Sequence, residues 1–569
     1  MLFRLDDAHD LEVQSKPQIT HAISHLIVSP ALRQQYVEAQ CAIQNIIDAQ
    51  MEHTPPRLLQ TSTGRLCDRE SQINAFKTST QYRELFLLLV GDANLQMQRI
   101  QDVVVAFFSY VMLSHRWEGK EARLHEIQDE PIYELNSVGG IVKLQSFCKV
   151  VQDAGYRWAW VDTCCIDQTN NVELQRSVNS MFAWYHHSTL TIIYLSDVPP
   201  SSRSGAMAKS VWNTRGWTVQ EFLAPKIVLF YQNDWTLYLG DTTPNHKEST
   251  AIMQELEQAT SINKEALTGF RPGMRDAREK LQWASNRVTT LPEDIAYSLF
   301  GIFGVHLPVI YGETKQNSLG RLLQEIIAQS GDITCLDWIG KSSEFNSCLP
   351  ANITSYAAPP FILSSLSEEE MEVLTSSLRD AAVVELASQL YTTLEHLSAP
   401  RFAHRRLHLP CIVFTVTEVS RKPSQEEGAY TLKTNSLDDL LISTEDKLIP
   451  FSRRIPIRQE LLIVRPWDRN FLESYDFADP EDDARSIRTE NSAMPPNFSS
   501  GDDVSTDSES DSRALRLIAR LGQPFRAFLV AQRRGGEYSR IAADHDIIAQ
   551  VKDRASVRDM MDVRTLEIL

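Results

Sequence analysis

The segment R-G-W-T-V-Q-E-F-L-A-P, residues 215–225, is the stretch around which the fold can be read. Its apolar residues fall on one face, which predicts a short, largely buried helix. Asn213 or Thr214 is expected to cap the start, and Pro225 is expected to end the helix after about two turns. Glu221 is then a carboxylate in apolar surroundings, and such a group needs either a charged partner or a chemical role.

Short apolar segments alternate with amphipathic helices on both sides of this stretch. Four segments have strand character, and between them lie a helix ending at Gly155 and a second helix at 172–187. Alternation at this spacing predicts an α/β domain with a parallel sheet. The expected strands are 110–113, 158–162, 190–195 and 226–231.

Polar and aromatic residues follow the expected strands where each strand ends. Ser114, Arg116 and Trp117 come after the first strand, and Asp162 closes the second. Ligands of open parallel sheets bind outside the carboxyl ends of the strands. The sequence therefore predicts that these residues gather at one edge of the sheet.

The remainder of the 569-residue chain divides by composition and pattern. The segment from 473 to 512 is acidic and rich in Ser, Asn and Pro, which predicts disorder. The expected regions are a helical N-terminal region at 1–100, the α/β domain at 101–245, a helical extension at 246–340, a mixed α+β C-terminal domain at 341–472, the acidic loop at 473–512 and the remainder of that domain at 513–569.

Net charge and targeting signals limit the function classes. The formal net charge of -18 argues against a nucleic-acid or anionic-membrane partner. The first residues lack a secretory signal, the longest apolar runs are too short for a membrane span, and the eight cysteines show no C-x-x-C spacing. We therefore expect a cytoplasmic protein with reduced thiols. The nucleotide-binding loops G-x-x-x-x-G-K-[ST] and G-x-G-x-x-G and the hydrolase elbow G-x-S-x-G are absent.

Three motifs, in this order and spacing, resemble the fungal heterokaryon-incompatibility (HET) domain. They are Y-V-M-L-S-H-R-W at 110–117, W-V-D-T-C-C-I-D-Q at 160–168 and R-G-W-T-V-Q-E at 215–221. The resemblance implies non-self recognition and programmed cell death when fungal cells fuse. HET domains are distantly similar to Toll and interleukin receptor (TIR) domains, which implies a flavodoxin-like sheet. One departure is H-R-W-E-G at 115–119, where a small residue followed by W-G is commoner.

Some TIR domains cleave NAD+ with the glutamate of a W-x-x-x-E segment, which the resemblance places at Glu221. Breaking the nicotinamide–ribose bond passes through an oxocarbenium-like state, and the leaving group departs neutral, so one carboxylate suffices. The resemblance thus implies NAD+ as substrate, with no permanently bound cofactor. Trp117 and Trp217 are the candidates for ring stacking, and Ser114, Arg116 and Asp162 for polar contacts.

Other interpretations stay open at this point. Trp217 is also a candidate core anchor, Asp162 a candidate turn cap, and Glu221 a candidate structural partner of a distant arginine. Cys164 and Cys165 lack a second pair of ligands, so no metal site is expected. The alternative to an enzyme is a signalling module that acts by self-association, and an incompatibility partner protein is expected in either case.

Overall fold

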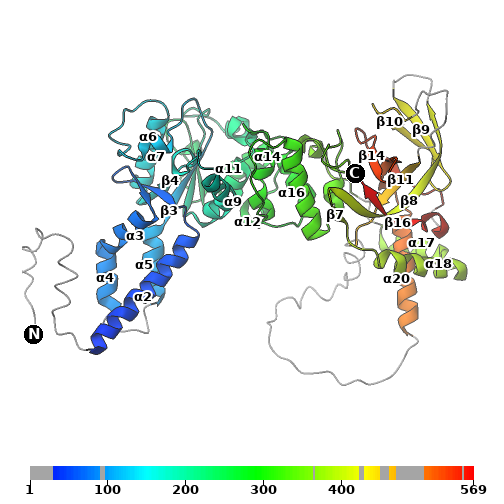
Figure 1. Cartoon of the computed structure of the whole chain (residues 1–569), viewed down its shortest axis with the longest axis horizontal. Coiled ribbons are helices and arrows are strands. Elements are labelled where there is room, and N and C mark those ends of the chain that lie inside the picture. Colours follow the sequence, from blue (N-terminus) through cyan, green and yellow to red (C-terminus); the bar gives the residue numbers. More distant parts are fainter. Residues whose placement is uncertain are drawn as a thin grey trace, which may run out of the picture. The chain divides into compact units, whose positions relative to one another are not determined.

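The computed structural model describes residues 30–89, 97–362, 366–421, 428–448, 460–469, 505–553 and 556–569 (Figure 1). The chain forms two compact units that interleave along the sequence. The first unit holds residues 1–174, 183–194 and 225–245, and the second holds 175–182, 195–224 and 246–569. Each unit is described by itself.

The first unit is built on a six-stranded sheet in the order β2-β1-β4-β3-β5-β6. The four strands β4, β3, β5 and β6 are parallel, which confirms the predicted α/β class. The strands are β1 (Arg57–Gln60), β2 (Arg65–Asp68), β3 (Tyr110–His115), β4 (Trp158–Trp160), β5 (Leu190–Tyr194) and β6 (Val228–Tyr231).

The hairpin formed by β1 and β2 corrects the prediction of a purely helical N-terminal region. β1 pairs antiparallel with β4, and Leu59 lies opposite Ala159. Leu58 and Leu59 are fully buried in this position. Strands of four residues give too little periodicity to detect, and the turn between them contains Gly64 at φ +70°.

Helices surround this hairpin in the sequence and connect the parallel strands. The rest of the described N-terminal region is helical, and the helix expected to end at Gly155 is α7. The helices that begin in this unit are α2 (Pro30–Glu52), α3 (Arg69–Lys77), α4 (Thr80–Leu89), α5 (Met97–Phe108), α6 (Leu124–Ile127), α7 (Gly140–Asp153), α8 (Asp162–Cys165) and α9 (Asn171–His187).

Helices also follow residue 246, where a helical extension was predicted. Its helices are α11 (Thr250–Thr260), α12 (Lys264–Gly269), α13 (Ala277–Ser285), α14 (Asp294–Tyr297), α15 (Phe300–Phe303) and α16 (Lys315–Ser330). They belong to the second unit together with α10 (Thr218–Leu223), the short helix expected from the R-G-W-T-V-Q-E segment.

Close packing of this extension depends on Gly301, because a Cβ added there would lie 2.2 Å from Cβ of Phe182. We expect Gly301→Ala to lower the free energy of unfolding by about 1–3 kcal/mol, the usual cost of overpacking a core. Gly269→Ala is the matched control, because nothing lies within 4 Å of its added Cβ and alanine is the better helix former. Urea unfolding of both variants tests this, and equal stability of the two would contradict it.

The C-terminal part of the second unit is mixed α+β, as predicted, and its sheet closes on itself. β8 (Arg406–Arg421) pairs with β7 (Arg401–Ala403), β9 (Ala429–Thr434), β11 (Leu461–Pro466) and β16 (Val563–Ile568). The path returns from β11 to β16 through β13 (Phe528–Gln532) and β14 (Tyr538–Ile541), while β10 (Leu440–Ser443) extends β9. A separate pair joins β12 (Phe525–Arg526) to β15 (Ile548–Ala549).

Helices α17 (Glu368–Ser377), α18 (Ala381–Glu395) and α20 (Ser505–Leu521) supply buried residues to the core of this sheet. α20 corrects the predicted disorder of 473–512 for its last eight residues; 473–504 lie outside the described residues. Asp511 on α20 accepts a hydrogen bond from Oγ of Ser388 at 2.9 Å. Among the described residues, no helix has the length and apolar character needed to cross a membrane.

Candidate functional site

Three side chains meet at the carboxyl ends of β3 and β4. Nε2 of His115 lies 3.1 Å from Oδ1 of Asp162, and the indole N–H of Trp117 donates to Oδ2 of the same carboxylate at 2.9 Å. His115 is the last residue of β3, so the strand runs two residues further than predicted, and Asp162 opens α8 instead of ending a strand. The predicted gathering of the first two loops is therefore seen within the first unit.

An ion pair between a half-buried lysine and a buried glutamate fixes the backbone of the loop after β3. Nζ of Lys143 on α7 lies 2.6 Å from Oε1 of Glu121, which also accepts the backbone N–H of Glu118 at 2.6 Å. The same ammonium donates to the carbonyl oxygen of Arg116 at 3.3 Å. The Arg116 side chain is exposed, and Trp117 is 38% exposed. The loop thus presents a cation and an aromatic ring on an ordered backbone.

Two aromatic residues, Tyr194 at the end of β5 and Trp235 just after β6, belong to the same edge of the sheet. Tyr194 stacks on Trp235 with ring centroids 4.4 Å apart, and its hydroxyl donates to the carbonyl of Asn233 at 2.9 Å. Burial, with the nearby carboxylates of Glu118 and Asp234, raises the pKa of Tyr194. β3 lies between β4 and β5, so the strand order reverses here, and such a reversal is where open α/β sheets bind ligands.

Ser114 precedes His115 on β3 and is fully buried. The structure therefore places it within the sheet and not in a loop, where the sequence analysis had put it. Its register partner on β5 is Ile193. Ser114, Arg116, Trp117 and Asp162 all belong to the first unit, whereas Trp217 and Glu221 belong to the second.

In the second unit, close backbone packing holds the R-G-W segment. The N–H of Gly216 donates to the carbonyl of Val288 at 2.9 Å, and the N–H of Val288 donates to the carbonyl of Thr214 at 2.7 Å. A Cβ on Gly216 would lie 2.6 Å from Cγ2 of Thr289. Glycine in this motif therefore permits the approach of the 288–289 backbone.

The cap expected for α10 is wrong. The helix begins at Thr218 with Trp217 at the N-cap position, where no side chain caps it. Ser210 instead caps a separate 3-10 helix, Val211–Thr214, by accepting the N–H of Trp212. The residues before Arg215 thus form their own turn, which the sequence pattern merged with the following helix.

Glu221 is buried in the second unit beside another buried charge, Arg287. The Arg287 guanidinium donates to the carbonyl of Arg215 at 3.1 Å, to the hydroxyl of Thr218 at 3.0 Å and to the carbonyl of Trp283 at 3.1 Å. Burial lowers the pKa of Arg287 to about 9, and the carboxylate of Glu221 opposes this by raising it. Glu221 therefore contributes to keeping Arg287 charged, which fits the structural interpretation left open above.

Trp217 is held by a carboxyl group that the sequence analysis missed. Its indole N–H donates to Oδ2 of Asp294 at 3.1 Å. Burial raises the pKa of Asp294 to about 6, against hydrogen bonds from Trp217 and Tyr311 that lower it, while the charge of Glu293 adds to the rise. Burial and Asp294 in turn raise the pKa of Tyr311, which keeps its hydroxyl protonated. A carboxyl group perturbed in this way is a common mark of functional sites.

No group of three His, Cys, Asp or Glu side chains in the described part of the chain could hold a metal ion. Cys164 and Cys165 are both buried. A hydrogen bond to Cys165, together with burial, raises the pKa of the Cys164 thiol.

Residues 110–209 match the family described as heterokaryon incompatibility protein (HET). The chain contains a HET domain. It is also similar to the vegetative incompatibility protein HET-E-1 of Podospora anserina, with 36% identity over 232 residues. That similarity covers 39% of this chain and 16% of the relative, so the chain matches well under two thirds of the relative's length. No solved structure matches the chain significantly.

The family match covers the His115–Trp117–Asp162 cluster and ends before Trp217 and Glu221. Within the HET domain, the sequence analysis missed Glu121 and Lys143, because an ion pair between a loop and a helix leaves no spacing signal. Tyr194, as the last residue of a strand, could have been found by the rule that selected Asp162. Trp235 lies beyond the matched residues and outside any motif.

Proposed function

We propose that this chain is an effector of fungal vegetative incompatibility, acting in non-self recognition and programmed cell death together with an incompatibility partner protein. The observation that carries the proposal is the HET domain at 110–209, in a chain that is 36% identical over 232 residues to a protein named for vegetative incompatibility. Further support comes from the ordered polar cluster of His115, Trp117 and Asp162 at the ligand-binding edge of its sheet.

The strand order supports a flavodoxin-like, and hence TIR-like, sheet. Numbered by sequence, the parallel strands β3, β4, β5 and β6 lie in the order 2-1-3-4. This is the order of the first four strands in the flavodoxin-like 2-1-3-4-5 arrangement. The hairpin of β1 and β2 is an addition on the β4 side.

The chemistry we propose is cleavage of NAD+, with Glu221 as the catalytic carboxylate. Glu221 is four residues after Trp217, the spacing of W-x-x-x-E, and Trp217 immediately precedes α10. A carboxylate held in a low-dielectric setting stabilises the positive charge that develops on the ribose ring. Trp217, in the same unit as Glu221, is proposed to stack on a ring of NAD+.

The test measures NAD+ loss by the purified full chain at several protein concentrations, beside Glu221→Gln. Removal of one preorganised electrostatic group costs about 10²- to 10³-fold in rate, so Glu221→Gln is expected to lose NAD+ turnover by that factor. Glu257→Gln, an exposed glutamate on α11, is the matched control and should turn over NAD+ like the unchanged chain. Undiminished NAD+ loss in Glu221→Gln would contradict the proposal.

The second candidate function is a signalling module that acts by self-association. The observation favouring it is that Glu221 is only 7% exposed and raises the pKa of the buried Arg287, as a structural carboxylate would. Under this alternative, the chain stays toxic to fungal cells when Glu221 is replaced by Gln, and no NAD+ is consumed even where the protein self-associates. Sedimentation of the unchanged chain and of Glu221→Gln at matched concentrations shows whether self-association is the same in both. Toxicity and NAD+ loss measured at those concentrations then separate the two functions.

A further inference from the structure

A cavity of about 490 Å³ lies in the C-terminal part of the second unit. Its walls come from the start of α13, the 3-10 helix Ile333–Leu336, the segment 360–361, the end of β11 and the strand β12. Small-molecule sites typically enclose 300–1,000 Å³. The cavity therefore has the size of a site for a small organic ligand.

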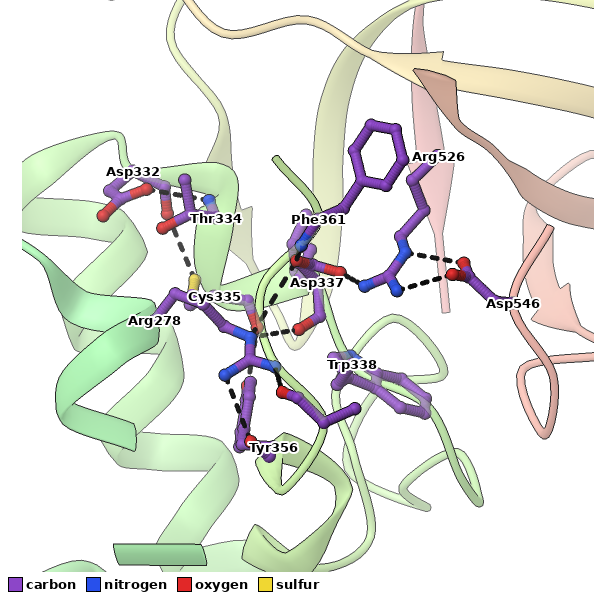
Figure 2. A network of polar contacts seen from close by, with 12 residues as sticks. Arg278, Asp332, Thr334, Cys335, Asp337, Trp338, Tyr356, Phe361, Arg526 and Asp546 are labelled. Atoms are coloured by element: carbon purple, nitrogen blue, oxygen red, sulfur yellow. Dashed lines mark hydrogen bonds and ion pairs between the residues drawn. The ribbon is translucent and has the colours of Figure 1, made fainter. Parts of the chain in front are cut away.

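One wall of the cavity is a polar network that already satisfies its own charges (Figure 2). Arg526 makes a bidentate pair with Asp546, at 2.6 and 2.8 Å, and an ion pair with Asp337. Asp337 also accepts the backbone N–H of Phe361 at 2.8 Å. Arg278 donates to the carbonyls of Asp337, Tyr356 and Ala358. These groups hold the wall together and leave little capacity for a ligand.

Arg465 at the end of β11 differs from these two arginines. Its Nη1 donates to the carbonyl of Leu521 at 2.6 Å, and its guanidinium lies 4.6 Å from the centroid of the Phe525 ring. Arg465 is 6% exposed, and no carboxylate of the described residues forms an ion pair with it. Burial lowers its pKa to about 9. A buried cation without a counter-charge is costly, and a guanidinium has five N–H donors to fill.

The surroundings of Arg465 select the kind of anion. Apolar rings of Phe361, Trp467, Phe525 and Phe528 line the cavity. Four acidic residues also line it and are half-buried or exposed: Asp276, Glu279, Asp332 and Asp468. These carboxylates repel an entering polyanion, whereas a single negative charge that reaches Arg465 meets a bidentate partner. Nucleotides and phosphate esters are therefore disfavoured.

We propose that this cavity binds a small aromatic monocarboxylate, with the carboxylate paired to Arg465 and the ring among Phe361, Trp467 and Phe525. The pairing supplies a counter-charge that none of the described residues provides, and the rings supply apolar contact area. The site is independent of NAD+ cleavage, because it uses none of the residues proposed for that reaction. It gives the C-terminal part of the chain a ligand-sensing role.

The test is calorimetric titration of the full chain with 3-phenylpropionate and with its neutral isostere, 3-phenylpropionamide. A charge-assisted pair to a buried guanidinium is expected to make the acid bind at least about tenfold more tightly than the amide. Phenyl phosphate, a dianion, is expected to bind more weakly than the acid. Equal binding of acid and amide, or no binding of the acid at about 10 mM, overturns the proposal.

Variants of the cavity residues test whether the aromatic acid binds at Arg465. Arg465→Met should remove the preference for the acid, and Arg465→Lys should retain part of it because the charge remains without the planar fork. Asp276→Asn at the rim should strengthen binding of the acid by about twofold, because one repelling charge is removed. Asp276 has φ 57°, a conformation that asparagine adopts readily, so this variant should fold. An acid preference that survives in folded Arg465→Met overturns the assignment to this cavity.

Discussion

Replacing Arg287 with methionine is expected to lower the free energy of unfolding by about 3–5 kcal/mol at neutral pH. The change removes a guanidinium that ties Trp283, Arg215 and Thr218 together, and it removes a positive charge that interacts with the buried carboxylate of Glu221. Breaking a buried charge pair from one side costs more than the pair itself contributes, because the remaining charge stays out of water. Urea unfolding at pH 7 measures the loss.

A double-mutant cycle separates the pair from the individual hydrogen bonds. Glu221→Gln is measured alone and in combination with Arg287→Met, and a coupling free energy above about 1 kcal/mol identifies the two as a structural pair. Arg275→Met, at an exposed position in the same region, is the matched control and should change stability by less than about 0.5 kcal/mol. Additive effects would show that Glu221 does not depend on Arg287, which favours a chemical role for this carboxylate.

The parallel sheet was predictable because its strands carry their own signal. Buried runs such as 110–113 and 190–195 are bounded by polar residues and separated by helices of ordinary length, so period and spacing agree. The β1–β2 hairpin was not predictable in this way, because each strand has four residues and its burial depends on pairing with β4. The prediction of disorder for the acidic start of α20 was wrong for a related reason. Its residues suit a helix only because Ala514 and the following apolar residues are buried in the core.

The candidate site was predictable where it lies at strand ends and not where it depends on tertiary contacts. Trp117 and Asp162 were placed together by the rule for parallel sheets, and they share a hydrogen bond. Asp294 holds Trp217 from 77 positions along the chain, and Arg287, which follows α13, interacts electrostatically with Glu221 on α10. Nothing in sequence spacing reports such pairs, because their distance is set by the fold. The sequence did predict that Glu221, as a lone carboxylate in an apolar helix, needs a charged partner or a chemical role.

Asp294 is expected to make the stability of the chain depend on pH between about 4 and 6. Burial raises its pKa from 3.8 to about 6 in the folded chain. Asp294 is therefore protonated more easily in the folded than in the unfolded state. Its protonation contributes fully to the free energy of unfolding below pH 3.8, and this contribution is lost as the pH rises through about 6. A shift of about two units corresponds to about 3 kcal/mol. Other groups titrate in the same range, so the effect must be read from a difference between variants.

Asp294→Asn provides that difference, because asparagine resembles the protonated acid and its oxygen still accepts the indole N–H of Trp217. We expect the variant to be more stable than the unchanged chain by up to about 3 kcal/mol at pH 8, and the gain to vanish near pH 4. Asp153→Asn, at an exposed aspartate, should follow the unchanged chain at both pH values. A variant that is less stable at pH 8 would mean that the hydrogen bonds from Trp217 and Tyr311 outweigh burial and keep Asp294 ionised. In that case a negative charge, and not a neutral acid, holds the tryptophan of the W-x-x-x-E segment in place.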